Sequence, residues 1–310
     1  LVLPIVNDLK KYKNKTPRNI HHINGMVAED WEHKAANLIL EYFRLLRRER
    51  RLFISYKRTD SERIALQLYA ELDRRGYDVF LDTRSVPPGD NFQDELWHRM
   101  ADSDVVVLLD SPEFKTSPWT QLEYERAHAS RLQIVHVLWP SVQPTSLASL
   151  SVFIPLEGAS FTGSFQTGAR AKLGSSTIGL ISDRVEQVRA AALAARNRAL
   201  IDSCCDLARD LNLQADLQPN LSILITKPST KAAGPKELAV VPMVGVPNAL
   251  RIDRMLRSLS SLGSNPTTVW ALYDDQGLLK EICSHLDWLN GKLPADTVSV
   301  YSLKRDLQNL

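Results

Sequence analysis

The chain has 310 residues, of which 44% are hydrophobic and 24% are charged, and its 38 Lys and Arg residues nearly balance 36 Asp and Glu residues. This length corresponds to about two domains of ~100–200 residues each. The composition is that of a folded globular chain and excludes collagen-like and largely disordered proteins. A net charge of +2 gives no general electrostatic reason for binding nucleic acid, so we expect no nucleic-acid partner.

The cysteines and the apolar runs indicate the compartment. Three cysteines, two of them adjacent at Cys204 and Cys205, and the absence of a CxxC pair do not make a disulfide framework. No apolar run approaches the ~20 residues of a membrane helix, and the first residues lack the pattern of a secretory signal. We therefore expect a cytoplasmic protein with no membrane partner. The sequence begins with Leu1 instead of Met, so we expect a fragment, an alternative start or processing.

Residues 1–50 predict a loosely ordered leader followed by an amphipathic helix over about 28–48, where apolar residues recur at helical spacing. This helix ends in the basic run RLLRRERR. Such a run is typical of a solvated helix end that the helix dipole favours, and a phosphate-binding patch is the alternative.

Residues 51–157 alternate between short apolar runs and helical patterns. Strands of this kind predict a parallel sheet covered on both faces. Right-handed crossovers then make a doubly wound α/β domain, with ligands expected at the carboxyl ends of the strands. The expected strands are RLFISY, YDVFLD, DVVVLLD, QIVHVLWP and FIPLE, and the expected helices cover about 60–76, 92–101 and 119–130.

The remainder predicts a linker over 158–181, a long helix over 182–211 and a second, smaller α/β unit over 212–310. Pro242 and Pro247 make the stretch between Val240 and Val246 awkward for a central strand. An apolar stripe is expected along the long helix at Val185, Val188, Ala192, Ala195, Leu200 and Cys204. The strands expected in the second unit are LSILIT, ELAVVPMV, TTVWALYD and TVSVYSL, with helices at about 248–262 and 275–290.

Four segments lie where strands of the first sheet end: FISYKRTD, VFLD with the following loop RSVPPGDNF, LLDSPEF, and SPWTQLE. In this order and spacing they resemble the Toll/interleukin-1 receptor (TIR) domain family, over residues 51 to about 157. The resemblance implies a flavodoxin-like sheet, and it makes RSVPPGDNF the loop through which such domains associate. Members of this family either assemble without catalysis or, as in microbial NAD-cleaving members, break the nicotinamide–ribose bond of NAD.

The enzymes of this family carry a glutamate one helical turn after a tryptophan. Trp119 and Glu123 are four residues apart in SPWTQLE and so share one helix face. The resemblance therefore implies that Glu123 is catalytic. A carboxylate there would stabilise an oxocarbenium-like ribose, and nicotinamide leaves without needing a general acid. The alternative is a solvent-facing glutamate near a helix start, of which Glu125 is an example.

The resemblance also implies an NAD-binding set around this glutamate. Phe53 and Trp119 are expected to flank the nicotinamide ring, with core packing as the alternative. Arg58 is expected at the pyrophosphate or ribose, with a surface salt bridge to Asp60 or Glu62 as the alternative. The set is completed by Tyr56, Asp82 and Ser117, where the last two have structural alternatives as a loop tie and a helix cap.

Other chemistry is not supported by the sequence. The motifs GxGxxG, GxxxxGK[ST], GxSxG and HExxH do not occur, so we expect no metal and no cofactor, with NAD as a substrate.

The expected function is therefore a TIR-type NAD glycohydrolase, activated by self-assembly and serving as an effector in microbial, anti-phage immunity. The leader, the long helix and the C-terminal unit would sense a ligand or a partner protein. Two alternatives stay open: a non-catalytic TIR module that signals by homotypic assembly, and an enzyme that makes a cyclised or base-exchanged product.

Overall fold

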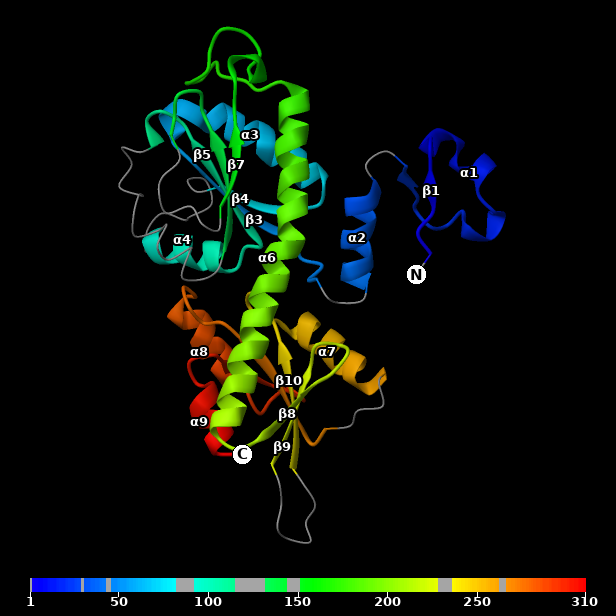
Figure 1. Cartoon of the computed structure of the whole chain (residues 1–310), viewed down its shortest axis with the longest axis vertical. Coiled ribbons are helices and arrows are strands. Elements are labelled where there is room, and N and C mark those ends of the chain that lie inside the picture. The colour runs from blue at the N-terminus through cyan, green and yellow to red at the C-terminus, as the bar shows by residue number, and fades with distance from the viewer. Residues whose placement is uncertain are drawn as a thin grey trace. The chain divides into compact units, whose positions relative to one another are not determined.

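The computed structural model describes residues 2–28, 31–42, 46–81, 92–114, 132–143, 151–227, 236–261 and 266–310. These residues fall into two compact units, Leu1–Arg48 and Glu49–Leu310, whose elements are shown in Figure 1. Within these ranges, no helix combines the length and the apolar character needed to cross a bilayer.

The first unit is built from short elements. Strands β1 (Ile5–Val6) and β2 (Met26–Val27) pair in parallel, and the Tyr12 hydroxyl lies 2.6 Å from the carbonyl oxygen of Ile23. The expected amphipathic helix is α2 (Trp31–Tyr42), which is shorter than the predicted 28–48. The turns between the strands are η1 (Leu9–Lys11), α1 (Tyr12–Lys15) and η2 (Arg18–Ile20).

The second unit opens with a five-stranded sheet in which every strand pair is parallel. Its spatial order is β4-β3-β5-β6-β7, which is the 2-1-3-4-5 order of flavodoxin-like proteins. The predicted doubly wound α/β fold is therefore confirmed. The strands are β3 (Arg51–Tyr56), β4 (Asp78–Leu81), β5 (Val105–Asp110), β6 (Gln133–Leu138) and β7 (Ser151–Pro155).

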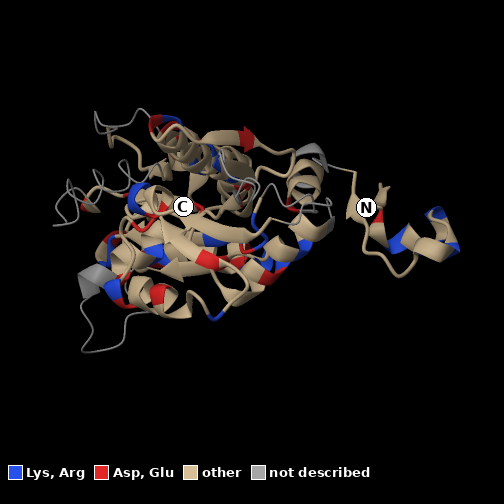
Figure 2. Cartoon of the chain, turned by 90° about the horizontal axis from the view of Figure 1, so that it is seen from below, with Lys and Arg blue, Asp and Glu red and all other residues tan. Residues whose placement is uncertain are grey.

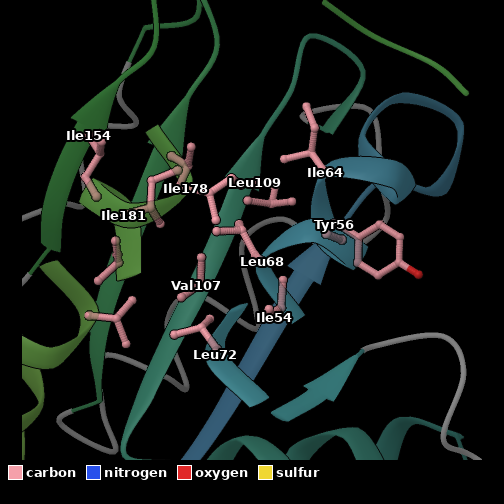
Figure 3. Close-up of a cluster of buried hydrophobic side chains, with 14 of the residues drawn as sticks. Ile54, Tyr56, Ile64, Leu68, Leu72, Val107, Leu109, Ile154, Ile178 and Ile181 are labelled. Carbon is pink, nitrogen blue, oxygen red and sulfur yellow. The ribbon is translucent and has the colours of Figure 1, made fainter. Parts of the chain in front are cut away.

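The two faces of this sheet are buried by different helices. Helix α3 (Arg58–Arg74) and the first half of α6 (Ser175–Asp210) pack on one face, where Leu68 and Ile181 meet the strand residues, as Figure 3 shows. Helix α4 (Phe92–Ala101) packs on the other face. The third helix expected from the sequence, 119–130, lies outside the described residues.

Residues 158–173, which the sequence predicts as part of a linker, pack against the sheet domain. Phe161, Ala171 and Leu173 belong to the same hydrophobic core as α3. The Gly168 N–H donates to the carbonyl oxygen of Asp60 at 2.7 Å, which ties this segment to the start of α3. The short helix η4 (Gly158–Ser160) begins the segment.

Helix α6 is longer than predicted because it begins at Ser175 rather than at 182. It contacts β5 and β6 of the first sheet and continues to the second sheet, so that both sheets share one helix (Figure 1). Of the predicted stripe, Ala195 is exposed, whereas Val185, Val188, Ala192, Leu200 and Cys204 are buried. Arg189 and Arg196, which helical periodicity does not single out, are buried instead.

Ion pairs join α3 to α6. Arg75 lies 2.7 Å from the Glu71 carboxylate on its own helix and 2.6 Å from Asp183 on α6. Elsewhere, basic and acidic residues are interspersed along the elements, as expected for a net charge near zero (Figure 2). Hydrogen bonds from Arg74 and Arg75 lower the pKa of Glu71 from 4.5 to about 2.

Replacing Glu71 by Gln should therefore lower stability at pH 7 by up to about 1 kcal/mol. The folded-state pKa is depressed, so the contribution of Glu71 is fully present above about pH 4.5 and is lost as the pH falls towards 2. Urea unfolding of both proteins at pH 7 and pH 3 measures this. A difference that is as large at pH 3 as at pH 7 would contradict the assignment.

A second five-stranded sheet follows α6, in the order β12-β11-β10-β9-β8. The central strand β10 is parallel to β11, which is parallel to β12, while β9 runs antiparallel to its two neighbours. Pro242 is the last residue of β10, so the missing N–H falls at the strand end and a central strand is possible there after all.

The strands of the second sheet are β8 (Gln214–Leu217), β9 (Ile223–Lys227), β10 (Lys236–Pro242), β11 (Thr268–Tyr273) and β12 (Asp296–Ser299). The helices are α7 (Ala249–Ser261), α8 (Lys280–Leu289) and α9 (Leu303–Gln308). This mixed α/β unit is the predicted second unit. The predicted strand TVSVYSL is shorter in the structure, because α9 begins at Leu303.

Candidate active site

The carboxyl end of β3 leads almost directly into α3. Tyr56 ends the strand and is buried, and Arg58 begins the helix with an exposed side chain. Lys57 at the N-cap provides no side-chain hydrogen bond to the first turn. A helix start of this kind favours anionic groups through its free N–H groups and its dipole.

Asp60 joins this helix start to the loop that follows β5. Its carboxylate accepts a hydrogen bond from the Glu113 N–H at 2.9 Å, and the neighbouring Thr59 hydroxyl donates to the Glu113 carboxylate at 2.9 Å. The structure thus brings together two of the strand-end segments that the sequence singles out, FISYKRTD and LLDSPEF. Both lie at the carboxyl edge of the sheet, where ligands bind in this fold.

Phe53 and Tyr56 occupy opposite faces of β3. Phe53 is fully buried and stacks on Phe80, with ring centroids 5.4 Å apart and an interplanar angle of 18°. Tyr56 packs in the core that α3 covers. The burial of Phe53 favours core packing, which is the structural alternative to its predicted contact with nicotinamide.

Four predicted site residues lie outside the described residues: Asp82, Ser117, Trp119 and Glu123. Asp82 directly follows β4 in the chain, and the other three belong to the connection from β5 to β6. Their roles stay predictions.

A hydrogen-bonded Asp–His pair near the same edge is not predicted from the sequence. Nδ1 of His136 on β6 lies 2.6 Å from Oδ2 of Asp110, the last residue of β5, and the imidazole stacks on Phe153 with centroids 5.0 Å apart. Because an ionised carboxylate only accepts hydrogen bonds, Nδ1 carries the proton when Asp110 is ionised. The signal in the sequence was an Asp that ends one apolar strand and a His inside the next strand along the chain.

Two serine hydroxyls are buried at this edge. Among the residues that the structure describes, the Oγ atoms of Ser55 and Ser111 find no hydrogen-bond partner, and both residues are fully buried. The strand register places Ser55 in one row with Leu108 and His136, on the same sheet face as Phe53. Buried hydroxyls that lack a hydrogen bond are uncommon and mark a place where a ligand can supply one.

The residues that the structure describes do not indicate a metal site or a reactive thiol. No group of three or more His, Cys, Asp or Glu side chains there is placed to hold a metal ion. Burial raises the pKa of the Cys204 thiol to about 12, so the nucleophilic thiolate is scarce at neutral pH.

Comparison with known proteins agrees with this geometry. A family model described as a TIR domain matches residues 52–172. A probable 2′ cyclic ADP-D-ribose synthase of Brachypodium distachyon is 27% identical over 147 residues, which make up 46% of this chain and 65% of that protein. The chain therefore aligns with slightly less than two thirds of this relative.

Two solved structures of a metazoan TIR-STING receptor from C. gigas also match, one of them in complex with 2′,3′-cGAMP. They are 13% and 12% identical and cover 83% of this chain and 94% and 96% of theirs, with TM-scores of 0.32 and 0.30. Scores this low do not establish a shared arrangement. The sheet order and the family match together identify residues 52–172 of this chain as a TIR domain.

Proposed function

We propose that the chain cleaves the nicotinamide–ribose bond of NAD+, releasing nicotinamide and either ADP-ribose or a cyclic ADP-ribose. The observation that carries this proposal is the TIR domain match at residues 52–172, a segment that contains the Trp119–Glu123 pair. The likeness to a probable cyclic ADP-ribose synthase supports NAD+ as the substrate class.

Glu123 is the proposed catalytic residue. Its carboxylate would stabilise the positive charge that develops on the ribose as nicotinamide leaves, by electrostatic attraction and by hydrogen bonds to ribose hydroxyls. NAD+ is then the substrate, and no metal or cofactor takes part. Water or a hydroxyl of the substrate itself would complete the reaction, and the choice between them decides whether the product is linear or cyclic.

The described part of the edge supports a place for the rest of NAD+. Arg58 at the start of α3 can meet the pyrophosphate with bidentate hydrogen bonds, next to helix N–H groups that favour anions. The link from Asp60 to Glu113 holds this helix start against the loop after β5. The proposed NAD-contacting residues are Tyr56, Arg58, Asp82, Ser117 and Trp119, whereas Phe53 is buried against Phe80 and would act through packing.

The same proposal includes regulation and biological setting. Activity would depend on self-association of the TIR domain through the loop 84–92, and the C-terminal unit would respond to a ligand or partner protein. An enzyme that consumes NAD+ only when assembled suits a cytoplasmic effector of microbial, anti-phage immunity.

The test is direct. The purified chain is incubated with NAD+ at increasing protein concentration, nicotinamide is followed by chromatography, and the second product is identified by mass spectrometry. We expect nicotinamide release whose specific rate rises with protein concentration. A mass equal to ADP-ribose indicates hydrolysis, and one lower by a water molecule indicates cyclisation. No release at any concentration would favour a TIR module that acts only by assembly.

A further inference from the structure

The loop between α4 and β5 is buried although it consists of three polar residues, Asp102, Ser103 and Asp104. Their exposed fractions are 4%, 2% and 0%. Buried carboxylates require charged or hydrogen-bonding partners. The partners of this loop come from three different parts of the chain. We therefore call residues 102–104 the junction.

Helix α6 supplies the first set of partners. The Arg189 guanidinium donates to the Asp104 carboxylate at 2.7 Å, and both side chains are fully buried. Arg196, about two turns further along, donates to the carbonyl oxygens of Ser103 and Ala101, each at 2.8 Å. The junction is thereby fixed to the helix that both sheets share.

The second sheet supplies the next contact. The Val246 N–H donates to Oδ1 of Asp102 at 2.9 Å. Arg251 on α7 holds the loop around Val246, because its guanidinium donates to the carbonyl oxygens of Val244 and Val246, each at 2.9 Å. This loop follows the carboxyl end of β10, one of the three parallel strands of the second sheet, and ligands of open α/β sheets bind at the carboxyl ends of such strands.

The loop after β11, at the same edge, also meets the end of α4. Gly277 lies so close that a Cβ atom there would be 3.2 Å from Cβ of Ala101. Beside this contact is a cavity of about 600 Å³, lined by Trp97, Met100 and Leu132 of the TIR domain and by residues 276–281. Because the two surfaces are packed incompletely, they can separate with a small loss of apolar contact.

Asp102 also connects this contact with the candidate active site. Its Oδ2 atom pairs with the guanidinium of Arg51, the first residue of β3. The opposite end of β3 carries Tyr56 and leads to Arg58. Helix α4, whose C-terminal end is held by these contacts, begins at Phe92, which is the last residue of the predicted association loop 84–92.

We propose that the Val246–Asp102 contact is autoinhibitory: the carboxyl edge of the second sheet holds the end of α4 and keeps the TIR domain in its resting state. A ligand that occupies this edge would compete with the contact and release α4. A contact made in the resting state stabilises that state, so its loss shifts the population towards the active one. The effect on activity rests on the proposed NAD+ cleavage.

The experiment breaks the contact from each side. Asp102→Ala removes the acceptor, and Arg251→Ala loosens the loop around Val246 without changing the TIR domain. Asp78→Ala is the matched control, because Asp78 also lies near Arg51, at 3.8 Å, but its side chain is 78% exposed and makes no hydrogen bond to the described residues of the second sheet. Melting temperatures verify that each variant is folded, and Arg251→Ala carries the test if Asp102→Ala is not.

Hydrogen–deuterium exchange over residues 92–104 and NAD+ cleavage are both measured. We expect about tenfold faster exchange and about tenfold higher cleavage in the two variants, and wild-type values in the control. Unchanged exchange, or a fall in cleavage at an unchanged melting temperature, overturns the proposal. If exchange responds while no protein cleaves NAD+, the restraint on α4 is upheld and the proposed enzymatic function is the part that fails.

Discussion

Replacing Glu123 by Gln is expected to reduce nicotinamide release from NAD+ by about 10²–10³-fold, with little change in the NAD+ concentration at half-maximal rate. Glutamine keeps the shape and the hydrogen-bonding oxygen of the side chain but removes the negative charge. Electrostatic stabilisation acts on charge that develops only in the transition state, so its loss lowers kcat more than binding. Initial rates with purified protein at a concentration that gives full wild-type activity measure the effect.

Glu125→Gln is the control, because it removes the same charge two residues along the chain. A helix turns by about 200° over two residues, so Glu123 and Glu125 cannot share a face if this segment is helical as predicted. We expect wild-type rates for Glu125→Gln. If both variants lost the same fraction of nicotinamide release, activity would depend on the net charge of this segment, and the proposed catalytic role of Glu123 would be wrong.

The second large effect concerns stability. Replacing Asp104 by Ala should lower the free energy of unfolding by about 3–5 kcal/mol, because it leaves the buried Arg189 guanidinium without its carboxylate partner. Urea unfolding followed by circular dichroism measures this change. If Asp104→Ala proves too unstable to purify, the melting temperature of Arg189→Met tests the same pair from the other side.

Asp202→Ala is the matched control on the same helix. Asp202 pairs with Arg198 at 2.8 Å, but their side chains are 51% and 74% exposed. Water screens such a pair, so its loss should change the free energy of unfolding by well under about 1 kcal/mol. Similar losses in the free energy of unfolding for both variants would contradict the prediction that breaking the buried Asp104 pair destabilises the protein more than breaking an exposed pair.

The sheet of the TIR domain could be predicted because its strands are continuously apolar. Each of the runs around Phe53, Val107 and Val135 is buried on both faces, so its composition identifies the strand without reference to periodicity. Strand β8 was missed for the opposite reason. Its residues Gln214–Leu217 are mostly exposed at the edge of the second sheet, so burial leaves no pattern in the sequence.

The buried residues of helix α6 could be predicted from helical periodicity only in part. The predicted stripe assumes that one face meets one core, but α6 meets two sheets in succession. Arg189 and Arg196 are buried because their partners, Asp104 and two carbonyl oxygens, are supplied by a loop about 85–95 residues earlier in the chain. Propensity and spacing cannot reveal such long-range pairing.

The candidate site could be predicted only in part, because strand order can be read from the sequence but strand register and long-range packing cannot. The chain order of the strands places Arg58 and the loop after β5 at one sheet edge, and the structure brings them together through Asp60 and Glu113. The Asp110–His136 pair was missed, because it requires the register between β5 and β6. The full burial of Phe53 follows from packing against Phe80 and α4, which a single strand does not disclose.

The shared helix also constrains how the protein is made. Residues Ile178, Ile181 and Val185 complete the core of a sheet whose last strand ends at Pro155. During synthesis, the TIR sheet therefore cannot complete the core on the face that α3 and α6 share until the first half of α6 has left the ribosome. Until then the nascent chain exposes a surface prone to aggregation. Once α6 is complete, its second half provides a helix surface against which the C-terminal sheet can pack.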